Sequence, residues 1–252
     1  MSSEAPLALE CRGLRKEFRL GEELTLQRSL QALKPGRRQP IGRFTALHEV
    51  TFHVPRGAFF GIVGSNGSGK STLTQVISGI SVPTAGEVRT WGRILPLLEV
   101  GAGFHEELTG RENVDLLGAV MGLKRREIEA AVPRIVEFAG VDQHMDTALK
   151  RYSSGMKARL SFASAICFPA DTYVFDEVLA VVDDDFREAC IKELEILNGQ
   201  GRTIIFMSHD LSLVRSVCTS GMWLEKGFVQ LQGTMAEVAD RYERSHHAAV
   251  PA

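Results

Sequence analysis

A glycine-rich run that ends in lysine and serine is the strongest chemical signal in the sequence. Gly64-Ser65-Asn66-Gly67-Ser68-Gly69-Lys70-Ser71 fits the pattern G-x-x-x-x-G-K-[ST], with an apolar stretch before it and a helix-like stretch after it. The glycines let successive backbone N–H groups point at phosphate oxygens, and the N-terminus of the following helix adds partial positive charge. Lys70 would pair with β and γ phosphates, and the Ser71 hydroxyl would ligate Mg²⁺. The run, with Thr72, therefore predicts nucleotide-phosphate binding, a chemistry that kinases, GTPases and motors share.

Two carboxylates follow a second apolar stretch. Tyr173-Val174-Phe175 leads directly into Asp176 and Glu177. Asp-Glu after a strand is usually a solvated turn, but a phosphate loop upstream gives the pair a chemical task. Asp176 is placed to hold Mg²⁺ through water, and Glu177 to polarise an attacking water as general base.

The elements that would position these residues alternate between strand and helix patterns. Residues 7–11 and 46–63 have strand patterns, Ser71–Ile80 is helix-like, and 172–175 and 203–207 are short apolar strands followed by a polar turn and a helix. Between them, residues 111–168 show helical spacing and no convincing strand. The outline is an α/β core interrupted by a helical insertion.

Length, composition and charge narrow the class of protein. A chain of 252 residues with 44% apolar content fits one large domain or two lobes, and a formal net charge of -2 argues against a nucleic-acid binder. No apolar run approaches the ~18 residues needed to cross a bilayer, and MSSEAPLALECRG lacks the features of a signal peptide. Cys11, Cys167, Cys190 and Cys218 are scattered, which disfavours a zinc site or disulfide framework.

Three further segments resemble motifs of the ABC ATPase family. Tyr152-Ser153-Ser154-Gly155-Met156 resembles the signature motif LSGGQ, Ser208-His209 resembles the switch histidine, and Asp183 matches the D-loop aspartate. With the two motifs above, all five occur in the family's order, and the resemblance covers residues 7–242. It implies a RecA-like P-loop core with an antiparallel β edge subdomain and an inserted α-helical subdomain.

The resemblance also implies a division of this single nucleotide-binding domain. Residues 7–98 and 169–232 would form the RecA-like core with the β subdomain, 104–168 the helical subdomain, 19–43 a basic amphipathic insertion, and 243–252 a tail.

A shared mechanism follows from the same resemblance. ATP with Mg²⁺ would join two copies of the chain in a homodimer. The signature segment Ser153, Ser154, Gly155 and Met156 of one copy would lie against the site of the other, with Ser153 and Gly155 facing the γ-phosphate held there. His209 would contact that phosphate and orient Glu177. Hydrolysis would remove the γ-phosphate contacts and let the dimer open.

The chain also departs from the family pattern at several positions. Tyr152, Ser154 and Met156 stand where LSGGQ has Leu, Gly and Gln, and Val182 precedes the aspartate where a small residue is common. The usual Q-loop glutamine is not evident; Glu99 is the candidate occupant and a candidate water-mediated Mg²⁺ ligand.

These departures resemble one group of ABC proteins in particular. LLEVGAGFHEELTGREN (97–113), RYSSGMKARLSFA (151–163) and DEVLAVVDDDF (176–186) are similar to the ATPase subunits of polysaccharide exporters that serve O-antigen, teichoic acid and capsule. The resemblance implies a peripheral location on the cytoplasmic face of the inner membrane, two copies of a polytopic membrane subunit, a lipid-linked polysaccharide substrate and no nucleic acid. A soluble ABC ATPase that is not coupled to transport is the alternative.

A basic insertion and two aromatic residues complete the predictions. Residues 12–43 hold nine Arg/Lys and three Glu, and Leu26, Leu30 and Leu33 have helical spacing, so 24–34 are expected to form an amphipathic helix at a membrane surface or lipid headgroup; a solvated loop is the alternative. Phe18 is the first candidate for stacking on adenine and Phe44 its rival, with core packing as the alternative for either.

Overall fold

The computed structural model of the protein describes residues 6–19, 42–97, 103–176 and 183–247. The strands of this part of the chain are β1 (Leu7–Arg19), β2 (Arg43–Pro55), β3 (Phe59–Val63), β4 (Ala85–Thr90), β5 (Ile94–Leu97), β6 (Thr172–Asp176), β7 (Thr203–Ser208), β8 (Ser220–Glu225) and β9 (Phe228–Thr234). The α-helices are α2 (Lys70–Ile77), α3 (Gly110–Val120), α4 (Arg125–Ala139), α5 (Ser154–Cys167), α6 (Asp184–Gly199), α7 (Leu211–Val217) and α8 (Met235–His247), with short 3-10 turns at Asp142–His144 and Leu149–Arg151.

A six-stranded sheet forms the centre of the core, in the order β5-β6-β7-β3-β8-β9. Neighbouring strands from β5 to β8 are parallel, and β9 pairs antiparallel with β8. Side chains alternate between the two faces of each strand, so β3 sends Phe59 and Val63 to one hydrophobic cluster and Phe60 and Ile62 to the other. Burial on both faces explains why these strands are continuous apolar runs in the sequence.

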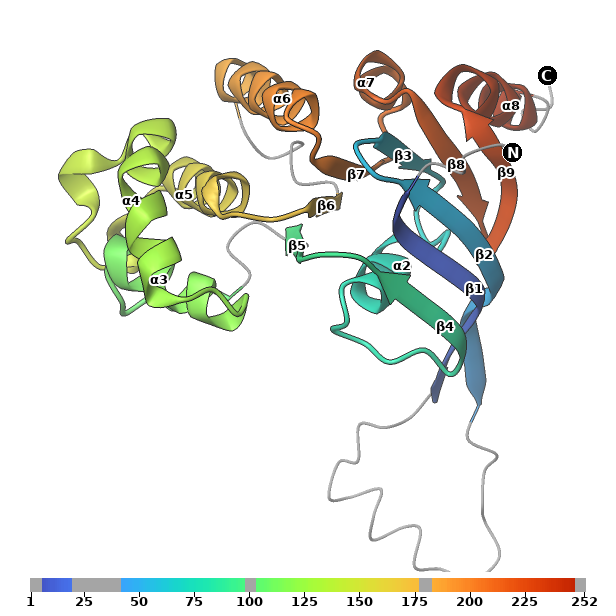
Figure 1. The fold of residues 1–252 in the computed structure, drawn as a ribbon, viewed down its shortest axis with the longest axis horizontal. Coiled ribbons are helices and arrows are strands. Elements are labelled where there is room, and N and C mark those ends of the chain that lie inside the picture. The colour runs from blue at the N-terminus through green and yellow to red at the C-terminus, as the bar shows by residue number, and fades with distance from the viewer. Residues whose placement is uncertain (1–5, 20–41, 98–102, 177–182, 248–252) are drawn as a thin grey trace, which may run out of the picture.

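Helices and a second sheet cover the two faces. Helices α6, α7 and α8 lie along one face, and α2 with the three-stranded sheet β2-β1-β4 lies on the other (Figure 1). The predicted strand region 46–63 is two strands of different sheets, because the chain turns between Pro55 and Phe59 through Gly57, whose φ of 71° is left-handed. The strand predicted over 7–11 continues to Arg19, where it pairs with Arg43 of β2.

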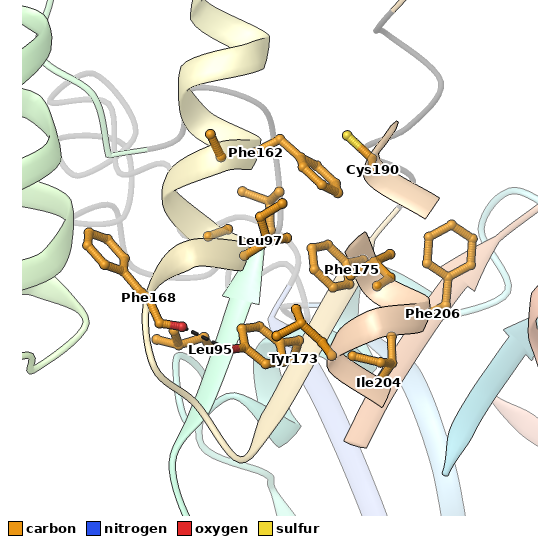
Figure 2. Close-up of a cluster of buried hydrophobic side chains, with 14 of the residues drawn as sticks. Leu95, Leu97, Phe162, Phe168, Tyr173, Phe175, Cys190, Ile204 and Phe206 are labelled. Carbon is orange, nitrogen blue, oxygen red and sulfur yellow. Dashed lines mark hydrogen bonds between the residues drawn. The ribbon is translucent and has the colours of Figure 1, made fainter. Parts of the chain in front are cut away.

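Helices α3, α4 and α5 form a separate helical lobe beside the β5–β6 edge of the large sheet (Figure 1). Its inner side packs on that sheet through Phe162 and Phe168, which lie among Leu95, Leu97 and Phe175 in Figure 2. The Tyr173 hydroxyl on β6 donates a hydrogen bond to the Phe168 carbonyl oxygen at 2.8 Å, which joins the end of α5 to the sheet.

The predicted class, an α/β core with antiparallel strands at its edge and inserted helices, is the one observed. Strand β4 was not predicted as a strand because five of its six residues are exposed and only Val88 is half-buried, so it carries no apolar alternation. Among the described residues, no helix is both long enough and apolar enough to span a bilayer.

Candidate functional site

The phosphate loop, residues 64–71, connects the end of β3 to the start of α2. Lys70 is the first residue of α2 and is 5% exposed. Its Nζ donates to the carbonyl oxygens of Gly64 at 2.8 Å and Ser65 at 3.2 Å. The loop therefore wraps around the ammonium group of Lys70, which lies close to the N-terminus of α2.

Glycine is required at two positions of this loop. Gly69 adopts φ 108°, which side chains rarely tolerate, and a Cβ there would lie 2.9 Å from the Ala46 carbonyl oxygen. A Cβ at Gly64 would collide with the Leu224 carbonyl oxygen and lie 2.6 Å from Ser68 Oγ. The loop can adopt this curved path only because Gly64 and Gly69 have no side chain at these close contacts.

The end of β8 and the turn that follows it also bond to the phosphate loop. Ser65 Oγ donates to Glu225 Oε1 at 2.8 Å, and the Gly227 N–H donates to the Ser68 carbonyl oxygen at 2.8 Å. Glu225 and Gly227 lie some 160 residues later in the chain and carry no motif, so sequence reasoning did not find them.

The predicted metal-binding carboxylate lies beside the loop. Asp176 ends β6 and is 6% exposed, and its Oδ2 lies 3.5 Å from Thr74 Oγ1 of α2. Thr74 is one helical turn beyond Lys70 and Ser71, so the carboxylate and the start of α2 are adjacent. Glu177, the predicted general base, lies outside the described residues.

The sheet register brings the ends of three strands to one level. Val63 at the end of β3 pairs with Ser208 of β7, and Asp176 pairs with Met207 of β7. His209 follows Ser208 directly and is exposed at this edge. The next residue, Asp210, donates its N–H to Ser208 Oγ at 2.9 Å and caps α7 by accepting from the Leu213 N–H. The phosphate loop, Asp176 and His209 therefore meet at the carboxyl edge of one parallel sheet.

A pocket of about 240 Å³ opens beside the phosphate loop. Its lining consists of Phe44 and Ala46 of β2 with Asn66, Gly67, Gly69, Lys70, Ser71 and Thr72. Phe44 is 52% exposed. Phe18 pairs with Phe44 across β1 and β2, but it is not among the lining residues, and Lys16 Nζ lies 5.2 Å from its ring centre. Of the two aromatic candidates, the structure places Phe44 in the pocket.

The signature-like segment begins α5 in the helical lobe. Ser153 is the N-cap, its Oγ accepting a hydrogen bond from the Met156 N–H at 3.2 Å, while Ser153 and Ser154 are both exposed. Tyr152 is buried, and its hydroxyl donates to the His144 carbonyl oxygen at 2.7 Å. Burial raises the Tyr152 pKa. Tyrosine at the usual leucine position is thus an anchor inside the lobe.

Residues 107–113, with the sequence ELTGREN, lie next to the start of α5. Thr109 and Glu112 form a capping box at α3, and the Asn113 amide, fully buried, donates to the carbonyl oxygens of His105, Leu108 and Thr109. The loop is tied to α5 by the ion pair of Glu106 with Lys157 at 2.7 Å. The ELTGREN segment and the signature-like segment, which both resemble the polysaccharide-exporter ATPases, therefore lie in contact in the structure.

The D-loop candidate Asp183 joins the helical lobe to the core. It caps α6 by accepting the Phe186 N–H at 3.0 Å with Oδ1, and its Oδ2 accepts from Arg159 Nη2 at 2.8 Å. The hydrogen bond from Arg159, followed by the one from the Phe186 N–H, lowers the Asp183 pKa. Arg159 was not singled out from the sequence, because an arginine on a helix has no distinctive spacing. Glu99, Val182 and the predicted helix 24–34 lie outside the described residues.

Comparison with known proteins agrees with this geometry. A family profile described as "ABC transporter" matches residues 47–180. The chain is 41% identical over 198 residues to "Teichoic acids export ATP-binding protein TagH" of Bacillus anthracis, covering 79% of this chain and 36% of that protein. It is 37% identical over 219 residues to "O-antigen export system ATP-binding protein RfbB" of Klebsiella pneumoniae, covering 87% of each.

Two other relatives are matched over only part of their own length. The chain spans 66% of the length of "ABC transporter protein AbcA" of Aeromonas salmonicida, at 42% identity and 81% of this chain, and 54% of an O-antigen export ATP-binding protein RfbB of Myxococcus xanthus, at 36% identity and 93% of this chain.

Among solved structures, an ATP-binding subunit of an ABC transporter superposes with a TM-score of 0.72 at 22% identity, covering 94% of this chain and 93% of the other. A dimeric post-hydrolysis state of the ATP-binding cassette MJ0796, bound to ADP and Pi, gives 0.71 at 21% identity, covering 90% and 98%. These likenesses show the fold.

Proposed function

Since the chain belongs to the ABC transporter family, we propose that it is the ATP-binding and ATP-hydrolysing subunit of an exporter for a lipid-linked polysaccharide. The observation that carries the ATPase part is the register of the large sheet, which brings the phosphate loop, Asp176 and His209 to one edge. Each of these lies at the end of a different strand. Together they place an ammonium group, a carboxylate and an imidazole near one another.

The described residues are suited to binding a nucleoside triphosphate. Lys70 and the N-terminus of α2 would stabilise the negative charge of the β and γ phosphates, and the buried setting of Lys70 strengthens that attraction. Phe44, exposed in the wall of the adjoining pocket, would stack on the base. His209 would contact the γ-phosphate, and Glu177 would accept a proton from the attacking water.

The donor set fits Mg²⁺. The Ser71 hydroxyl and the Asp176 carboxylate are hard oxygen donors on adjacent elements, as the 3.5 Å approach of Thr74 to Asp176 indicates. Glu99 is the third proposed contact, through water. When bound, the ion would neutralise charge on the phosphates.

A second copy of the chain would complete the site. Ser153 and Ser154 are exposed at the N-terminus of α5, and this lobe lies beside the β5–β6 edge rather than over the phosphate loop (Figure 1). A helix N-terminus favours an anion, so we propose that ATP joins two copies, each presenting its α5 start to the nucleotide of the other. A solved cassette of the same fold is described as dimeric with ADP and Pi.

The polysaccharide substrate is proposed from the relatives named for teichoic acid and O-antigen export. Such a subunit would work at the cytoplasmic face of the membrane with two copies of a membrane subunit. The basic segment 19–43 is proposed to contact the membrane surface or the anionic carrier lipid, because six Arg/Lys stand against two Glu in these residues.

A Glu177→Gln variant tests the hydrolysis. It keeps the size of the side chain but removes the base, so we expect ATP binding to persist while phosphate release falls by about a hundredfold or more, with an ATP-dependent dimer accumulating in size-exclusion chromatography. Wild-type turnover in this variant would exclude Glu177 as the base.

Co-purification tests the export. Extraction in detergent should recover a polytopic membrane protein with the chain, and lipid-linked glycans should stimulate its ATPase activity. Stimulation by small solutes alone would overturn the polysaccharide proposal, and an active ATPase recovered with no membrane protein would favour the soluble alternative. Deletion of residues 24–38 with unchanged export and ATPase activity would contradict the role of the basic segment.

A further inference from the structure

Glu225, the last residue of β8, connects the phosphate loop to helix α8. Its Oε1 accepts a hydrogen bond from the Ser65 hydroxyl at 2.8 Å, and its Oε2 accepts one from Trp223 Nε1 at 3.3 Å. Trp223 is 8% exposed and meets the ring of Tyr242 on α8 edge-on, with 5.7 Å between ring centres. The two oxygens of one half-buried carboxylate therefore bond to two donors, one in the phosphate loop and one that packs against α8.

The hydroxyl and the carbonyl group of Ser65 have different partners. The carbonyl oxygen accepts from Lys70 Nζ at 3.2 Å, and the hydroxyl donates to Glu225. A phosphate bound to Lys70 would compete with the Ser65 carbonyl oxygen for the ammonium group, because an anion is the stronger acceptor. The bond to Glu225 does not depend on that ammonium group, so it would persist when a phosphate is bound.

The turn after β8 fixes Glu225 in place beside the loop. Glu225 pairs with Phe228 of β9, and the two residues between them, Lys226 and Gly227, have left-handed φ angles of 48° and 79°, as in a tight hairpin turn. This conformation is uncommon for lysine, so the contacts around the turn must hold it. One of these contacts is the bond from the Gly227 N–H to the Ser68 carbonyl oxygen of the phosphate loop.

Glu225 lies beside the phosphate loop but does not line the pocket next to it. A phosphate loop binds well when its N–H groups already point at the phosphate oxygens, because ordering them during binding would cost affinity. On the premise of the proposed function, we propose that Glu225 is a positioning residue: it holds Ser65, and with it the first turn of the loop, in the form that accepts the phosphates. Trp223 and Tyr242 would orient the Glu225 carboxylate, so α8 would contribute to nucleotide affinity from outside the site.

Steady-state ATP hydrolysis by the purified full chain, together with titration of a fluorescent ADP analogue, tests this role. Glu225→Ala should raise KM for ATP about tenfold, the effect of one hydrogen bond to a charged acceptor, and change kcat by less than about twofold. Affinity for the ADP analogue should fall by a similar factor. Ser65→Ala should give the same loss. The double variant should be no worse than either single one, because both substitutions remove the same bond.

Two conservative variants separate the bonds of the carboxylate. The amide of Glu225→Gln has a single oxygen, which can serve Ser65 or Trp223 but not both, so its KM should lie between those of wild type and Glu225→Ala. Trp223→Phe keeps an aromatic ring against Tyr242 but removes the Nε1 donor. It should raise KM by a smaller factor, about two- to threefold, because the bond to Ser65 remains.

Glu237→Ala is the matched control. Glu237 on α8 accepts the Thr234 hydroxyl at 2.8 Å, the same distance as in the bond between Ser65 and Glu225, but it lies at the opposite end of the β8–β9 hairpin. Thr234 and Glu237 also bond to each other's backbone N–H groups at the start of α8. The substitution should therefore lower the midpoint of thermal unfolding while KM stays at the wild-type value.

Three results would overturn the proposal: a wild-type KM in both Glu225→Ala and Ser65→Ala, an equal rise of KM in Glu237→Ala, or a fall in kcat at unchanged KM in Glu225→Ala. Where Glu225→Ala does not fold, the KM values of Ser65→Ala and Glu225→Gln decide in its place. A wild-type chain that binds no nucleotide would instead remove the proposed function itself.

Discussion

The phosphate loop and the signature-like segment have a similar backbone arrangement but different surroundings. Each is a short run of Gly and Ser that leads into a helix N-terminus, α2 in the core and α5 in the helical lobe. In the phosphate loop the cation is built in and buried, with Lys70 5% exposed and the loop bonded to Glu225 and Gly227. At the start of α5, Ser153 and Ser154 are exposed and carry no formal charge.

The two regions differ in which groups they need from another molecule in order to bind a phosphate. The phosphate loop has its charge, its curl and its neighbouring carboxylate within one chain, so it is suited to bind a nucleotide alone. The start of α5 offers only N–H groups and hydroxyls, which are weak ligands for a phosphate in water. In the proposed dimer, the second copy would bring the phosphate to this helix start and exclude water.

Removal of the lysine should give the largest difference between the two regions. In Lys70→Ala we expect ATP hydrolysis to fall by about two orders of magnitude or more, because the charge that offsets the phosphates is lost. Phosphate release measures the effect. Folding should survive, since the buried charge itself is costly to desolvate. Lys192→Ala, which removes an exposed lysine on α6, is the control and should have full activity.

The two aromatic residues next to the phosphate loop should differ as well. Phe44→Ala should weaken ATP binding roughly tenfold, the order of magnitude of one base–aromatic stack, because Phe44 lines the pocket. Phe18→Ala is matched in chemistry and lies directly opposite on β1, yet it should change affinity little. Fluorescent nucleotide titration measures both. A larger loss in Phe18→Ala would restore Phe18 as the stacking residue.

At the start of α5, a single serine should affect stability and dimer formation separately. Ser153→Ala removes the N-cap, so we expect about 1 kcal/mol loss in the free energy of unfolding, together with loss of the ATP-dependent dimer. Thermal melting and size-exclusion chromatography measure the two effects. Ser154→Ala, one residue later and not a cap, should leave the melting midpoint unchanged. Dimer formation by Ser153→Ala at wild-type ATP concentrations would contradict the role of this segment at the interface.

The smallest effect expected is a change in the titration of Asp183. Its pKa is lowered in the folded chain, so the contribution of this carboxylate to stability is present above its unfolded pKa and is lost as pH falls through the lowered folded value. Carboxyl NMR should show a midpoint below the ordinary range for aspartate. In Arg159→Gln the midpoint should rise, because the first cause of the shift is removed. An unchanged midpoint would exclude Arg159 as that cause.

Much of the core was predictable because its strands carry strong local patterns. Strands β6 and β7 are buried on both faces, so their apolar runs stand out, and the phosphate loop has residue types that few other backbones need. Strand β4 has no such pattern, and the break between β2 and β3 depends on a single turn at Gly57.

By itself the sequence predicted the chemistry of the site from two local patterns, a phosphate loop and a pair of carboxylates after a strand, each readable because the reaction demands those residue types at fixed local spacing. The signature-like segment was identified only by its resemblance to a family motif. The tertiary structure decided which residues far apart in the chain support them. Phe44 rather than Phe18 lines the pocket, Glu225 bonds the phosphate loop, and Arg159 meets Asp183. These pairings depend on sheet register and helix packing, which join residues of large sequence separation and leave no periodic signal along the chain.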